Sequence, residues 1–115
     1  MIEETIKSLI GKIQAIRFQI QVGKNVYIGK YCDLKGKRHI VLEDGVAVRP
    51  YAQIWSVGGT VRIGKGSEIG ERCRISIANS LDIGEKVLLS PNVYITDCDH
   101  EYRNASIPVI DQGIV

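Results

Sequence analysis

The chain has 115 residues, of which 15 are basic and 13 acidic, and its formal net charge is +2. This length fits one domain with one small core. The charge is nearly balanced and forms no basic stripe, so nothing supports nucleic-acid binding. No stretch approaches the roughly 20 apolar residues that a membrane span needs. The sequence therefore argues against nucleic-acid-binding and membrane-spanning classes of protein.

The first segment, residues 1–16, has the spacing of a helix. Its apolar residues fall on one helical face: Ile2, Ile6, Leu9, Ile10 and Ile13. A solenoid must hide its open ends, so we expect this short helix to cover the first end of the repeats described next. Lys7 and Lys12 lie away from the apolar face and are too few to favour a helix on a membrane surface.

From about residue 17 to residue 96 the pattern is extended, and an aliphatic residue, often followed by Gly, recurs every six positions. Four runs of three hexads result: Val22, Ile28 and Leu34, then Leu42, Val48 and Ile54, then Ile63, Ile69 and Ile75, and finally Ile83, Leu89 and Ile95. The runs start 20, 21 and 20 residues apart. A fixed internal period is the sequence signature of a solenoid.

The hexad also predicts the geometry of each turn. If every sixth residue points inward from a flat face, three hexads make one triangular turn of chain. Successive turns then pair as parallel strands about 4.8 Å apart. The two or three extra residues between runs are expected at one corner. Small residues occupy the fifth position of the hexads, where they fit inside a corner: Val26, Cys32, Val46, Ala52, Ser67, Cys73, Val87 and Val93.

The three cysteines form neither a disulfide framework nor a Cys-x-x-Cys pair. Cys32 and Cys73 fall at the fifth position, so we interpret both as small buried packing residues. Cys98 breaks the pattern and is interpreted as a bystander thiol, with a reactive thiol as the alternative. The acidic residues Glu3 and Glu4 do not suit a secretory signal. Together these features predict a reducing, cytoplasmic setting.

After the last hexad, four ionisable residues fall within five positions: Asp97, Asp99, His100 and Glu101. Among side chains, only histidine titrates near neutral pH without perturbation. A histidine base needs a partner that fixes its tautomer, and Asp97 and Asp99 are candidates. The alternative is that the aspartates cap turns and His100 is a solvated loop residue.

The other motifs carry little chemistry. His39 lies in the basic stretch 35–39 with no acidic residue before Glu43, which favours a surface role. Two histidines cannot form a three-histidine zinc site within one chain, so we expect no metal. The glycine pairs do not precede helices and therefore predict no phosphate-cradling or dinucleotide motif.

The hexads resemble those of the left-handed parallel β-helix acyltransferases, the hexapeptide-repeat family. The repeat covers residues 22–95. The stretch 83–93, with His100 eight residues after Asn92, is similar to the sugar O-acetyltransferase branch. So are Asp99-His100-x-Tyr102, Ile107-Pro108 and Gln112-Gly113, which look most like the acetyltransferases of capsular, lipopolysaccharide or exopolysaccharide synthesis.

The resemblance implies one all-β domain over residues 1–115. A helical cap at 1–16 would precede a left-handed parallel β-helix at 17–96, and an active-site loop and truncated end would occupy 97–115. Members resembling this chain continue for several more coils, which supply much of the coenzyme A groove. We therefore expect the chain to be C-terminally truncated, and its contacts with coenzyme A stay unassigned.

The resemblance also implies a function. His100 matches the catalytic histidine, which takes the proton from an acceptor hydroxyl as that oxygen attacks the thioester of acetyl-CoA, the acyl donor. Asn92, Asp97, Asp99 and Tyr102 would lie on the side of the acceptor, a sugar or glycan. The family is trimeric, with each active site between two adjacent β-helices, which implies a homotrimer here.

Two alternatives remain open at the level of sequence. The first is a catalytically incompetent β-helical fragment that acts only as an oligomerising or structural module. The second, a γ-type carbonic anhydrase with zinc between subunits, shares the fold but lacks the histidines.

Overall fold

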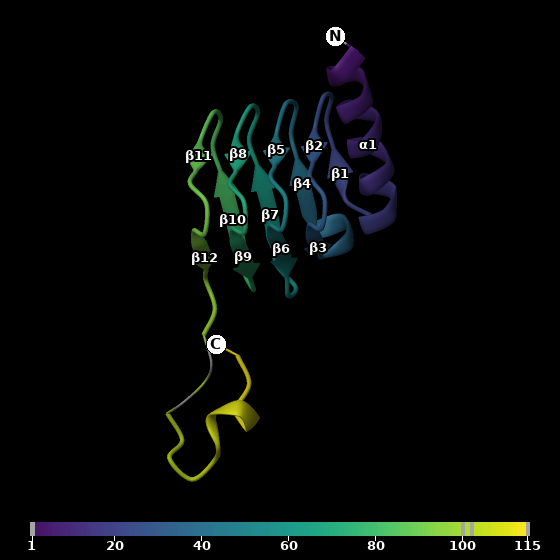
Figure 1. Cartoon of the computed structure of the whole chain (residues 1–115). Helices are drawn as coiled ribbons and strands as arrows, with labels where there is room; N and C mark the ends of the chain where they lie inside the picture. The colour runs from purple at the N-terminus through teal and green to yellow at the C-terminus, as the bar shows by residue number, and fades with distance from the viewer. Residues whose placement is uncertain (1, 100, 102, 115) are drawn as a thin grey trace.

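The computed structural model describes the backbone of residues 2–99, 101 and 103–114, with side chains from residue 5 onward. A single α-helix in this part of the chain, α1 (Ile2–Phe18), is followed by twelve short strands. The strands stack into a solenoid, with α1 lying across its first coil and the last segment leaving the opposite end (Figure 1). Two 3-10 turns, η1 (Lys37–His39) and η2 (Val109–Asp111), interrupt the loops.

Each coil contributes one strand to each of three parallel sheets. The first sheet contains β1 (Gln21–Val22), β4 (Ile40–Leu42), β7 (Thr60–Ile63) and β10 (Ser80–Ile83). The second contains β2 (Tyr27–Ile28), β5 (Ala47–Val48), β8 (Glu68–Ile69) and β11 (Leu88–Leu89). The third contains β3 (Asp33–Lys35), β6 (Gln53–Ser56), β9 (Arg74–Ile77) and β12 (Tyr94–Thr96). The chain is a left-handed parallel β-helix of about four turns, which confirms the predicted fold.

The hexad residues form the predicted ladders. Val22 pairs with Leu42, Leu42 with Ile63, and Ile63 with Ile83. The other two sheets repeat this register at the second and third hexad positions. In the two middle coils the ladder residues are at most 1% exposed, so the aliphatic side chains form one continuous core. This register is what the 20- and 21-residue spacing predicts.

Most fifth-position residues of the first three coils are buried inside the corners, whereas Val87 of the fourth coil is exposed. The polar ones make hydrogen bonds between coils. The Cys73 thiol is buried and donates to the carbonyl of Ser90 at 3.1 Å. Ser67 Oγ donates to the Gly84 carbonyl at 2.7 Å and accepts from the Val87 N–H at 2.9 Å. Burial of Cys73 is therefore confirmed. Cys32 is half-buried, and burial raises the pKa of its thiol, which donates to the Arg49 carbonyl at 3.1 Å.

The extra residues between runs were expected at one corner, but they lie instead in strands of the first sheet, at 40–41 in β4, 60–62 in β7 and 81–82 in β10. The corner between the third and first sheets precedes these strands. In the first coil this corner holds η1, where His39 is exposed, so its predicted surface position is confirmed. A pocket of about 560 Å³ is lined here by Gln19 and residues 36–39. It lies on the first coil, whereas the candidate catalytic segment follows the fourth.

Helix α1 covers the end of the solenoid with a face different from its apolar one. It packs on β1 and β2 through small residues: Gly11 and Ala15 are buried, and a Cβ at Gly11 would overlap the Val26 carbonyl oxygen. The apolar residues of the predicted face from Ile6 onward are instead exposed: Ile6, Leu9, Ile10 and Ile13, joined by Ile16. The face with Gly11 and Ala15 packs on the first coil because its small side chains allow the helix backbone to approach closely.

Candidate functional site

The segment that holds the candidate residues leaves the solenoid after β12. Its described residues belong to no strand of the three sheets, and in Figure 1 it runs away from the coils as a yellow-green loop. Asp97 and Asp99 belong to its described part. His100 and Tyr102, the predicted base and an acceptor-side residue, lie outside the described residues. The described part of the candidate site consists of the residues on either side of His100 and Tyr102.

Asp97 anchors the start of this segment. One carboxylate oxygen accepts the backbone N–H of Ala78 at 2.7 Å, and the other accepts those of Asn79 at 3.0 Å and Ser80 at 2.9 Å. These three donors form the corner that leads into β10. The hydrogen bonds, above all that from Ala78, lower the pKa of the Asp97 carboxyl below its ordinary value. Asp97 thus caps a turn of the chain and fixes the position from which the loop departs.

Replacing Asp97 by asparagine is expected to lower the thermal unfolding midpoint at pH 7, because an amide NH₂ cannot accept a backbone N–H. The carboxyl has a lower pKa in the folded state, so its stabilisation is complete above the ordinary value of 3.8. It is lost as the pH falls through the folded-state pKa. Melting curves of Asp97→Asn and the wild type at pH 7 should therefore differ, and the difference should shrink in acid.

The matched control is Asp111→Asn, because the Asp111 side chain is exposed and lies in η2, outside the solenoid. This variant should melt with the wild type at both pH values. An Asp97→Asn protein whose midpoint equals that of the wild type at pH 7 would contradict the anchoring role.

Cys98 lies against the solenoid beside this anchor. Its N–H donates to Thr96 Oγ1 at 3.2 Å, and its half-buried thiol is 3.3 Å from the same oxygen. The thiol also donates over 3.8 Å to the Ser76 carbonyl of the preceding coil. These contacts hold the chain close to the third sheet for one further residue. Its interpretation as a bystander thiol stays a prediction.

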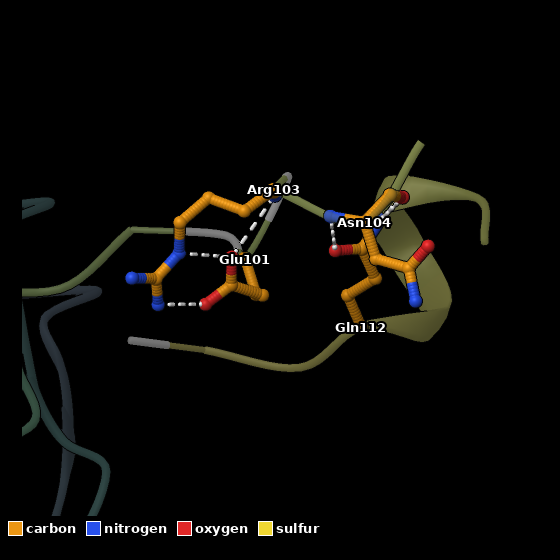
Figure 2. A network of polar contacts seen from close by, with 4 residues as sticks. All are labelled: Glu101, Arg103, Asn104 and Gln112. Carbon is orange, nitrogen blue, oxygen red and sulfur yellow. Dashed lines mark hydrogen bonds and ion pairs between the residues drawn. The ribbon is translucent and has the colours of Figure 1, made fainter. Parts of the chain in front are cut away.

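A second anchor lies just past His100, at Glu101. The Glu101 N–H donates to the Gly113 carbonyl at 2.9 Å and closes the loop on itself. Figure 2 shows its carboxylate facing Arg103, which donates from its backbone N at 3.0 Å, from Nε at 2.7 Å and from Nη2 at 2.5 Å. The hydrogen bonds to Glu101 raise the pKa of the Arg103 guanidinium. The half-buried Glu101 thus stabilises the shape of the loop through its bonds to Gly113 and Arg103.

Gln112 holds the rest of this loop together. Its amide Nε2 donates to the carbonyls of Asn104 at 2.7 Å and Ile107 at 2.6 Å, while Oε1 accepts the Asn104 N–H at 3.2 Å. In Figure 2 the Gln112 side chain reaches across from η2 to Asn104. Residues 101–113 therefore form a closed loop whose two sides are hydrogen-bonded to each other.

Asn92 occupies a different part of the fold. It lies at the corner before β12, with a left-handed φ of 64°, and its Oδ1 accepts from Arg72 Nε at 3.1 Å. Asp97 follows the other end of the same strand. The structure therefore brings Asp97 and the exposed Asp99 into one short segment, but leaves Asn92 separated from them by the length of β12.

Sequence reasoning missed the roles of Glu101, Arg103 and Gln112 in shaping the loop. A signal existed for the first pair, because side chains two residues apart on extended chain point to the same side. No comparable signal marks Gln112, since its partners are backbone groups five and eight residues away.

Among the described residues, no group of three or more His, Cys, Asp and Glu side chains is arranged to hold a metal ion. Within the same residues, no helix combines the length and hydropathy that crossing a membrane requires. The chain matches no family model, no curated protein and no solved structure.

Proposed function

We propose that this chain is an O-acetyltransferase that moves an acetyl group from acetyl-CoA to a hydroxyl of a sugar or surface-polysaccharide precursor, with His100 as general base. The observation that carries the proposal is the pair of anchors around residues 98–100. Three hydrogen bonds fix Asp97 to the solenoid, and the bonds of Glu101 to Gly113 and Arg103 order the loop on the other side. A general base must be held within hydrogen-bond reach of its proton, which such anchors favour.

The proposed chemistry needs one base and one oxyanion donor. The imidazole of His100 removes the proton from the acceptor hydroxyl while its oxygen forms a bond to the thioester carbonyl carbon. A backbone N–H stabilises the negative charge on the tetrahedral intermediate, a contribution of about 3 kcal/mol in other acyl-transfer enzymes. Collapse of the intermediate breaks the C–S bond, and the imidazolium returns its proton to the departing thiolate. The products are the sugar ester and free coenzyme A.

The proposed assembly is a cytoplasmic homotrimer in which each site lies between neighbouring β-helices. A loop that leaves its own solenoid suits a site completed by another subunit, because it extends beyond the three sheets (Figure 1). A heterologous contact repeated three times closes into a ring, which is the form such an assembly takes. The free cysteines suit a reducing compartment.

Replacing His100 by alanine is expected to lower the rate of acetyl transfer by about 10²–10⁴-fold, the usual contribution of a positioned base. The measurement is thiol release from acetyl-CoA in the presence of a panel of sugars and glycans. His39→Ala is the matched control, because His39 is exposed on the first coil and should leave the rate unchanged.

Equal background rates for the wild type and His100→Ala would overturn the proposal and favour a non-catalytic β-helical module. Stoichiometric zinc in the purified protein, together with carbonic anhydrase activity, would favour a metal site shared between subunits instead.

A further inference from the structure

Helix α1 presents an unpartnered apolar surface, which we name the α1 stripe: Ile6, Leu9, Ile10, Ile13 and Ile16. The exposed fraction of these side chains runs from 40% at Ile10 to 79% at Ile16. The opposite side of the helix, with Gly11 and Ala15, is buried on the first coil. A helix that only covered the solenoid end would bury its apolar side, so the α1 stripe needs another explanation.

The spacing of the α1 stripe is that of a coiled-coil seam. Residues 6, 9, 13 and 16 are separated by alternating steps of three and four, so they occupy successive a and d positions of a heptad. Ile10 widens the seam on one side. Side chains in this pattern insert into holes formed by another helix. The stripe therefore fits a helical partner better than an irregular protein surface.

We propose that α1 pairs with α1 of a second copy of this chain, antiparallel, through the α1 stripe. The chain offers one α-helix in its described part, and that helix carries the seam. Lys12 and Arg17 lie in the second half of the helix. Antiparallel pairing keeps these basic residues of the two copies apart and opposes the two helix dipoles. Parallel pairing in register would place like charges together.

The size of the surface is sufficient for such a pair. The five side chains expose on the order of 500 Å² of mostly apolar area. A two-fold contact that buried all of this area would remove on the order of 1,000 Å² from solvent over the two copies, which is about the minimum for a specific interface. If the chain is also trimeric, the same contact joins two trimers, so the inference does not depend on the proposed enzymatic activity.

A lipid surface fits the α1 stripe less well. Helices that lie on membranes expose a strongly cationic face opposite their apolar one and place aromatic residues in the apolar face. In α1 the opposite face packs on the first coil and carries Gly11 and Ala15. Its one aromatic residue, Phe18, packs against the solenoid core.

The test compares the molar mass of the full chain with that of Leu9→Gln/Ile13→Gln, measured by light scattering or sedimentation equilibrium. The expected mass of the wild type is twice that of the double variant at the same concentration. Val57→Gln is the matched control, because Val57 is 54% exposed on the turn after β6. Far-UV circular dichroism establishes that each variant is folded, and Ile16→Lys provides a second probe of the stripe.

Equal masses for all variants would overturn the pairing. Wild-type flotation with phosphatidylcholine–phosphatidylglycerol vesicles, lost in the double variant and accompanied by equal masses, would assign the stripe to a lipid surface. Orientation is tested by oxidative cross-linking against the wild-type background of three cysteines. Antiparallel helices bring residue 10 near residue 10 of the partner, so Ile10→Cys should form linked dimers and Ile16→Cys should not. Equal linking at both positions would overturn the antiparallel arrangement.

Discussion

Replacing Ile54 by alanine is expected to lower the free energy of unfolding by about 2–5 kcal/mol. Ile54 is 0% exposed at the middle of its ladder, between Leu34 of the coil before and Ile75 of the coil after. The loss contains the transfer free energy of the deleted groups and the cost of the cavity they leave. Hydrogen bonds along β3, β6 and β9 keep the coils at a fixed spacing, so the cavity cannot collapse. Urea unfolding followed by circular dichroism measures the effect.

The matched control is Leu88→Ala, because Leu88 is an aliphatic strand residue that is 68% exposed. A substitution at such a surface position is expected to change the free energy of unfolding by less than about 0.5 kcal/mol. Similar losses at Leu88 and Ile54 would show that the inward ladders are not the source of stability.

Replacing Gly64 by alanine is expected to cost about 1–3 kcal/mol, the range for forcing an extra methyl group into a packed interior. The added Cβ would lie 2.6 Å from the carbonyl carbon and oxygen of Gly84 and 2.9 Å from the backbone N of Glu85. All three atoms belong to the backbone of the next coil, so the clash is relieved only if two coils move apart. Loss of the hydrogen bond from the Gly64 N–H to the Ile83 carbonyl, now 2.7 Å, would accompany that movement.

Gly84 supplies the control because it holds the equivalent place one coil later, where a Cβ would meet no atom within 4 Å. Gly84→Ala should be neutral or stabilise by up to about 1 kcal/mol, since alanine restricts the unfolded chain. Thermal and urea unfolding of the two variants should therefore differ in sign or clearly in size. Equal losses would place the cost in the glycine backbone itself and not in contact between coils.

Much of the solenoid is predictable from the sequence because one rule repeats. The pairing of Val22 with Leu42 and Ile63 follows from the spacing alone, since inward residues of successive coils must stack. The corner positions follow for the same reason. Cys73 shows this well: its place in the hexad predicted a buried packing residue without any information about its partners.

The orientation of α1 could not be predicted from its apolar pattern. That pattern indicates which side avoids water, but not whether the solenoid or another molecule covers it. Gly11 decided the outcome, because only a side chain of one hydrogen fits against the Val26 carbonyl. A small residue in a helix is also common for other reasons, so its meaning became visible only in the packed structure.

The polar contacts of the loop were the least predictable part. Asp97 binds backbone N–H groups 17 to 19 residues away, and every residue except proline offers such a group. The sequence therefore identifies Asp97 as ionisable without identifying its partners. The alternative in which an aspartate caps a turn describes its observed contacts.

The Asp97 anchor also couples the loop to the cooperativity of the solenoid. In a linear stack each coil is stabilised mainly by its nearest neighbours, so parts of the stack can open independently. Asp97 lies at the end of the fourth coil, and its carboxylate accepts hydrogen bonds from residues 78–80, where that coil begins. These bonds join the two ends of the coil. Opening of this one coil would therefore also free the start of the loop, where the contact of Cys98 with Ser76 still links the chain to the third coil. The position of the loop thus depends mainly on the stability of the fourth coil.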